Sequence, residues 1–187
     1  VEDLAIGPEG IMALTTDDGR LEVVDASGET IGGLRPDPAE PLLLSLTVST
    51  NPAQTIGFGD DIYFDNGFGN NIGGNAGRDI LVMRGGNDEF HGDDKADLIF
   101  GGAGDDAGEG NRGDDLIFGE AGSDNMLGGF GTDVLAGGAG NDAAFGDFGH
   151  DLLIGGAGTD ALDGGEGADL LRGDGALSLE EFRLWVI

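Results

Sequence analysis

A nine-residue repeat dominates this chain and limits what it can fold into. Between Gly74 and Arg172 the period recurs eleven times without insertion or deletion. Its consensus is G-G-x-G-x-D-x-U-x, where U is a large apolar residue, and its positions are numbered one to nine below. Two looser copies precede it, at 56–64 and 66–73, with Asp65 counted as an insertion between them. A fixed period this short predicts a solenoid, in which each repeat packs against its neighbours only.

The charge of the chain narrows the range of partners. The sequence has 37 acidic residues against 8 basic ones, which gives a formal net charge of −29. Such a chain repels nucleic acid phosphates and anionic membranes, so multivalent cations are its natural partners. The absence of cysteine excludes a disulfide framework and thiolate zinc sites.

Nothing in the sequence predicts insertion into a membrane. The longest apolar run, residues 42–48, is far shorter than a membrane-spanning helix requires. The first residue is Val1, and no signal peptide is recognisable at the start. We therefore expect the chain to be a piece of a longer protein or a processed product.

Composition divides the chain into three parts. Residues 1–55 contain no repeat and form a small β-rich segment and linker, with strands expected at 11–15, 21–25 and 42–50. Residues 56–172 form the array of about thirteen repeats. In residues 173–187, Ser178 and Glu181 make a capping-box pattern, which predicts a short helix from Leu179 to the end that caps the array.

Each repeat combines a turn with a strand. The first six positions predict a turn, with glycines that let the backbone take positive φ, and the last three predict a short strand. Calcium takes six to eight oxygen ligands, and turn carbonyls together with one carboxylate suit it well. The alternative is that each aspartate only caps its own turn by hydrogen bonding. That explains one such turn, but twelve carboxylates stacked about 4.8 Å apart would repel one another without a cation.

The motif resembles the RTX (hemolysin-type calcium-binding) repeat family over about two-thirds of the chain. The resemblance implies an all-β fold, a right-handed parallel β-roll with two repeats in each coil and up to about eleven calcium ions between the turns of successive coils. The metal ligands that it implies are the aspartates at position six: Asp61, Asp79, Asp88, Asp97, Asp106, Asp115, Asp124, Asp133, Asp142, Asp151, Asp160 and Asp169. Asn71 is assigned the place of this aspartate in the second copy, and Lys95 replaces the position-four glycine of its repeat, so the neighbouring sites are expected to be weaker.

Two repeats in each coil imply two sheets, an odd sheet and an even sheet, built from alternate copies. The odd sheet directs position eight into the core, through Tyr63, Leu81, Ile99, Ile117, Leu135, Leu153 and Leu171. The even sheet opposes it with Gly73, Phe90, Gly108, Met126, Ala144 and Leu162. The outer columns of the odd sheet are apolar, with Ile80, Leu98, Leu116, Val134 and Leu152 beside Val82, Phe100, Phe118 and Ile154. We expect residues 42–50 and the C-terminal helix to cover part of this face, and a protein partner, a second copy or a missing neighbouring domain to cover the rest.

These patterns predict a secreted or cell-surface calcium-binding protein without catalysis of its own. The acidic, glycine-rich chain would stay disordered without calcium and fold cooperatively when calcium binds. This behaviour fits type I secretion, the route that the resemblance implies. The alternative is the non-catalytic C-terminal module of a larger secreted enzyme, such as a lipase, a protease or a polysaccharide-modifying enzyme. An ice-binding roll is disfavoured, because it needs a regular threonine or asparagine column.

Overall fold

The computed structural model describes residues 53–174 apart from 57 and 66, with side chains from residue 56, and the backbone of five strands before them. The chain divides into two compact units, Val1–Leu46 and Thr47–Ile187. The first unit contains an antiparallel sheet whose strands follow chain order: β1 (Leu4–Ile6), β2 (Met12–Thr15), β3 (Leu21–Val24) and β4 (Thr30–Leu34). The strands expected at 11–15 and 21–25 are therefore confirmed, within one residue at each end.

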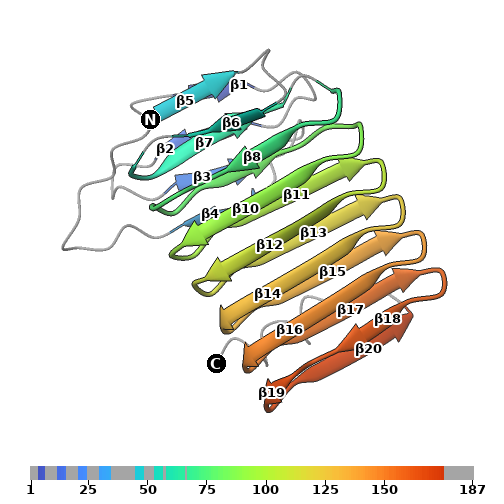
Figure 1. Ribbon diagram of the computed structural model, residues 1–187. Helices are drawn as coiled ribbons and strands as arrows, with labels where there is room; N and C mark the ends of the chain where they lie inside the picture. Colours follow the sequence, from blue (N-terminus) through green and yellow to red (C-terminus); the bar gives the residue numbers. More distant parts are fainter. Residues whose placement is uncertain are drawn as a thin grey trace. The chain divides into compact units, whose positions relative to one another are not determined.

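The second unit is built from two parallel sheets whose strands stack in regular steps, as Figure 1 shows. The odd sheet contains, in spatial order, β20 (Leu170–Asp174), β17 (Leu152–Ala157), β15 (Val134–Ala139), β13 (Leu116–Ala121), β11 (Leu98–Ala103), β9 (Ile80–Val82), β7 (Asp61–Phe64) and β5 (Ser45–Val48). The even sheet contains β18 (Ala161–Asp163), β16 (Ala143–Gly149), β14 (Asn125–Gly131), β12 (Ala107–Arg112), β10 (Glu89–Asp94), β8 (Asn71–Gly73) and β6 (Ala53–Thr55), with β19 (Glu166–Gly167) beside β16. The expected parallel solenoid is thus confirmed.

The register shows that two repeats make one coil. Leu98 pairs with Leu116, eighteen residues later, and the same step relates every pair of neighbouring strands in the array. The pairing continues into the turn, where Ala103 lies opposite Ala121. Strands in the middle of the array are therefore six or seven residues long, rather than the expected three. Successive turns have the same shape, so their backbones stay parallel and keep the hydrogen bonds between coils.

The second copy of the repeat has a different frame from the one expected. Asn71 pairs with Glu89, Ile72 with Phe90 and Gly73 with His91. Position eight is therefore Ile72, which is fully buried, and not Gly73. Position six is then Asn70 and not Asn71, and Asp65 is the first residue of this copy instead of an insertion. The array thus runs without interruption from residue 56 to residue 172.

The core lies between the two sheets and contains the position-eight residues of both. In the even sheet the column is Ile72, Phe90, Gly108, Met126, Ala144 and Leu162, and from Phe90 onward large and small residues alternate. Gly108 makes room for its own neighbour in the stack. At Gly108 an added Cβ would overlap the ring of Phe90, one coil earlier. This alternation lets a wide side chain occupy two layers of the core.

The apolar outer columns of the odd sheet are less exposed than the sequence suggests. Val134 and Leu152 are at most 5% exposed, and they form a second apolar cluster with Leu116, Ala136 and Ile154. Within these columns, strong exposure is found at Leu170 of the last coil, at 47%. The expected free interface therefore lacks the exposure on which it was based, and association through this face stays a prediction.

Of the C-terminal part, residues 173–187, the structure describes only residues 173 and 174. The helix expected from Leu179 lies outside the described residues. Strand β20 continues to Asp174, two residues past the last full repeat. Among the residues that the structure describes, no helix is long and apolar enough to cross a membrane.

The second apolar cluster gives a first prediction. Val134→Glu places a charge in a buried site of the odd sheet, so we expect the free energy of unfolding to fall by roughly 2 to 5 kcal/mol. Asn125→Glu adds the same charge at an exposed position of the even sheet and serves as the matched control. Urea unfolding of the calcium-loaded chain, followed by circular dichroism, measures both. Equal stability of the two variants would show that the outer column is not part of the packed structure.

Candidate metal sites

The turn glycines serve two purposes, which are a positive φ at some positions and free space at another. At position four the backbone adopts φ of 145° at Gly104 and 148° at Gly131, a conformation that side chains rarely allow. At position two it adopts the left-handed region, where Asn75 has φ of 70° and Asn111 of 73°. The expectation of positive φ is thus confirmed for positions two and four. It is wrong for position one, where the glycines leave space beside the aspartate instead.

A column of hydrogen bonds connects the position-six aspartates of successive coils. The backbone N–H of Asp79 donates to Oδ1 of Asp97 at 2.7 Å, and that of Asp97 donates to Oδ1 of Asp115 at 2.8 Å. The same bond recurs in the even turns, for example from Asp106 to Asp124 at 2.9 Å. Each carboxylate therefore caps the turn one coil earlier. This arrangement confirms part of the capping alternative, except that the partner is the preceding coil and not the aspartate's own turn.

At most of these aspartates the second carboxylate oxygen has no hydrogen-bond partner among the described residues. Oδ2 is buried and makes no such hydrogen bond at nine of the twelve positions: Asp79, Asp88, Asp97, Asp106, Asp115, Asp124, Asp133, Asp142 and Asp151. A buried, unpaired carboxylate oxygen is costly, because it has lost water without a replacement. Turn capping accounts for Oδ1 only, so a ligand for Oδ2 is still required.

The space beside Oδ2 is bordered by a second oxygen. A Cβ built on Gly74 would lie 2.6 Å from Oδ2 of Asp79 and 2.6 Å from the carbonyl oxygen of Gly92 in the next coil. At Gly101 the corresponding oxygens belong to Asp106 and Gly119, at 2.7 and 2.9 Å. Glycine at position one therefore keeps open a small space that a carboxylate and a carbonyl from two coils both face.

The donors present suit calcium better than a transition metal. In the part of the chain that the structure describes, no three acidic or histidine side chains converge on one point. A cation between the coils would therefore take a carboxylate oxygen from an aspartate and most of its other ligands from backbone carbonyls. Hard cations such as calcium accept this oxygen-only set. The residues present thus fit the ion that the repeat motif implies.

Burial raises the pKa of these carboxyls, because the charged form loses its hydration. The pKa of Asp97 rises from the ordinary value of 3.8 to about 10, and those of Asp79 and Asp133 rise to about 7. The hydrogen bond from the preceding coil lowers the pKa in each case, but by less than burial raises it. Burial raises the pKa to about 6 at Asp88, Asp106 and Asp115.

The individual positions differ in their surroundings. Asp160 and Asp169, in the last coil, accept the N–H of the preceding coil but are less buried than their equivalents. Asn70 donates its N–H to Asp88 at 2.7 Å, as an aspartate would, although its side chain carries no charge. Lys95 adopts φ of 83° instead of the values near 145° of the glycines, and the aspartate column continues through its repeat. The hydrogen-bonding part of that neighbouring site is therefore intact.

A second column, at position five, was not recognised from the sequence. Asp105 accepts the N–H of Ser123 at 2.9 Å, and Asn141 accepts that of Thr159 at 2.9 Å. These bonds connect each coil to the next one, in the opposite direction to the aspartate column. The frequent Asn, Asp and Ser residues at this position were the available signal, since short polar side chains are strong backbone-capping groups.

The raised pKa values give a prediction for the metal-free chain. An acid whose pKa rises on folding stabilises the folded state below its unfolded pKa, and this contribution is lost as pH rises through the folded pKa. For Asp79 and Asp133 that window runs from about 4 to about 7. In chelator, lowering the pH from 8 to 5 should therefore increase the β signal in circular dichroism. A signal that is unchanged, or that falls, would contradict the burial of neutral carboxyls.

Comparison with known proteins agrees with this geometry. Residues 84–107, 108–135 and 136–171 match the family model for the RTX calcium-binding nonapeptide repeat. No curated protein matches the chain at a significant level. The matched residues contain ten of the twelve position-six aspartates and the glycines beside them, and this matched part of the repeat array therefore belongs to the RTX calcium-binding nonapeptide repeat family.

Proposed function

We propose that this chain is an extracellular module that folds when calcium binds between its coils. The observation that carries the proposal is the column of buried Oδ2 atoms without hydrogen-bond partners. The twelve position-six aspartates are the proposed charged ligands, and turn carbonyls complete each site. Bound calcium would supply the positive charge that these buried carboxylates lack.

The proposed coupling of binding to folding follows from the charge balance. Without a cation, the stacked carboxylates must either keep a buried negative charge or take up protons, and both raise the free energy of the coil near neutral pH. The chain also contains 40 glycines, which lose much conformational entropy on folding. Calcium offsets both costs only in the folded state, so its binding free energy stabilises the fold.

Cooperativity is part of the same proposal. Each position-six carboxylate contacts its own coil and, through Oδ1, the coil before it. An ion that fixes this carboxylate therefore orders two coils at once. In a solenoid, where each unit contacts only its neighbours, such shared groups make the coils fold together.

An extracellular location and a role without catalysis are part of the same proposal. Calcium is abundant outside cells, where a chain of this kind would fold after export. The buried aspartates are engaged in the hydrogen-bonded column, so they are not free to act on a substrate. We propose, accordingly, a structural and binding role, either alone or as part of a longer secreted protein.

Calcium removal tests the proposal directly. In chelator at pH 8 we expect the circular dichroism spectrum of a disordered array, and in millimolar calcium a β spectrum. Magnesium at the same concentration is the control, because it demands a smaller octahedral site and gives up its water reluctantly. A β spectrum that persists in chelator at pH 8 would overturn coupled folding.

A pair of substitutions separates calcium binding from turn capping. Asp133→Asn keeps an oxygen that can accept the N–H of Asp115 but removes the charge, whereas Asp133→Ala removes both. If Oδ2 binds calcium, both variants should raise the calcium midpoint, by about twofold or more, because the array folds cooperatively. Asp169→Asn, in the less buried last coil, should have a smaller effect. If Asp133→Asn behaves as the wild type, capping alone explains the column.

A further inference from the structure

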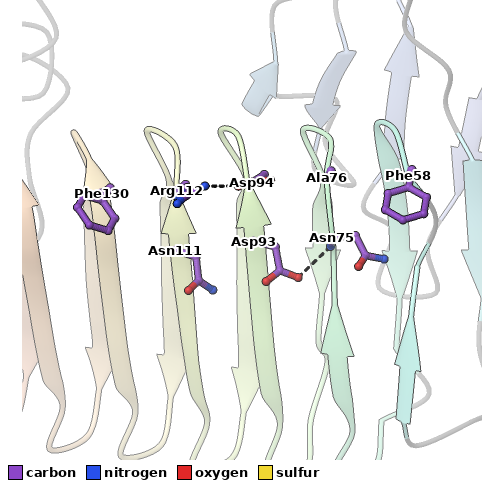
Figure 2. Close-up of a pocket in the computed structure, with 8 residues that line it drawn as sticks. All are labelled: Phe58, Asn75, Ala76, Asp93, Asp94, Asn111, Arg112 and Phe130. Atoms are coloured by element: carbon purple, nitrogen blue, oxygen red, sulfur yellow. Dashed lines mark hydrogen bonds and ion pairs between the residues drawn. The ribbon is translucent and has the colours of Figure 1, made fainter.

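One edge of the array carries a groove that calcium binding does not explain. The turns of the odd copies line it over five successive coils, and its volume is about 420 Å³. Figure 2 shows its residues in two rows, the position-three row with Phe58 and Phe130 at its ends and the position-two row beside it. The odd-turn groove is defined by Phe58, Asn75, Ala76, Asp93, Asp94, Asn111, Arg112 and Phe130.

The opposite edge shows that the fold does not require these side chains. Both edges have turns of the same repeat, yet position three of the even copies contains only glycine or alanine: Gly67, Gly85, Ala103, Ala121, Ala139 and Ala157. In the odd copies the same position is alanine once, at Ala76, and otherwise large: Phe58, Asp94, Arg112, Phe130, Phe148 and Glu166. Since small residues satisfy the backbone on one edge, the large polar and aromatic residues on the other edge need a separate reason.

The position-two row of the groove contains polar residues in a strained backbone conformation. Asn75, Asp93 and Asn111 hold φ between 70° and 77°, a region that costs free energy for residues other than glycine. The opposite edge has Gly102, Glu120 and Gly138 at this position, and Glu120 holds φ of 75° as well. Three successive coils of the groove therefore keep a planar polar side chain where glycine would be less strained.

The polar groups of the groove are held in place by their neighbours. Asp93 accepts the N–H of Asn75 at 3.0 Å, and the side-chain amide of Asn75 donates to the carbonyl of Ile56 at 2.5 Å. Arg112 lies 3.6 Å from Asp94 in an exposed ion pair. The groove thus presents amide, carboxylate and guanidinium groups, repeated at the spacing of the coils.

Exposed aromatic rings stand at both ends of the groove. Phe58 is 89% exposed and Phe130 is 57% exposed. Four coil steps of about 4.8 Å separate them, or about 19 Å. Phe130 also stacks on Phe148, with ring centroids 4.8 Å apart. A smaller hollow of about 150 Å³, which contains Glu109 and Asp147, continues beyond Phe130.

We propose that the odd-turn groove binds an uncharged polysaccharide chain that lies along the coils. Sugar rings present C–H faces, which pack on phenyl rings, and hydroxyl groups, which exchange hydrogen bonds with amides and carboxylates. The net charge of −29 disfavours an anionic glycan. The open, elongated shape suits an extended polymer better than a small molecule. The inference rests on the proposed function, because the groove exists only when the coils are stacked.

Calorimetric titration of the calcium-loaded chain with soluble neutral polysaccharides tests the proposal. We expect binding of at least one of hydroxyethyl cellulose, galactomannan and dextran, and none of the anionic polymer alginate. Phe130→Ala should weaken binding about tenfold. Asn111→Gly should weaken it as well, while it relieves strain at its position and so preserves the fold. Phe68→Ala, which removes an exposed phenylalanine of an even turn, is the matched control and should leave binding unchanged.

Circular dichroism of the same samples separates the two levels of inference. A chain that shows no calcium-induced β spectrum contradicts the proposed function, and the titration is then repeated at the pH that gives the β spectrum. If the folded wild-type chain binds none of the neutral polysaccharides, the groove proposal is overturned. So does equal binding by the Phe130→Ala and wild-type chains, and so does binding of oligolysine in place of every neutral polysaccharide.

Discussion

The structure depends on how one carboxylate is divided between two tasks. In the middle coils, Oδ1 of the position-six aspartate accepts a backbone N–H from the coil before, while Oδ2 is buried without a hydrogen-bond partner among the described residues. The first contact orders the stack and the second makes the stack unfavourable as long as no cation is present. Order and metal dependence therefore come from the same side chain. For this reason the array is inferred to be a calcium-dependent fold and not merely a fold that tolerates calcium.

The glycines make this division possible. At position one, glycine leaves the space that Oδ2 and a carbonyl of the next coil both face, as Gly74 does beside Asp79. At position four, the values of φ near 145° bring the turns of successive coils so close that a side chain would overlap the backbone one coil earlier. The residues of the nonapeptide consensus thus serve contacts between coils, and in an isolated repeat these contacts do not exist.

The sequence predicted the repeating architecture, but it did not predict features that depend on tertiary contacts. The period predicted a solenoid, and the resemblance to the RTX repeat family implied the parallel sheets, the two-repeat coil and the candidate ligands. The frame of the second copy was misassigned, because Gly67 and Gly69 imitate the glycine spacing of a turn one residue out of place. Partial cover of the outer face was expected, but the positions that it would bury, such as Val134 and Leu152, could not be predicted, because tertiary structure decides which part of a face is covered.

The register of a stack of nearly identical coils is weakly specified by its backbone, since a coil could pair with the wrong neighbour and make the same hydrogen bonds. The ring of Phe90 extends into the layer of Gly108, the residue that faces it one coil later. If the stack slipped by one coil, Phe90 would instead meet Met126, whose side chain would occupy that space. This pair of residues therefore favours the correct register over one that is shifted by a whole coil. A metal ion between equivalent turns cannot do this, because it would bind equally well in either register.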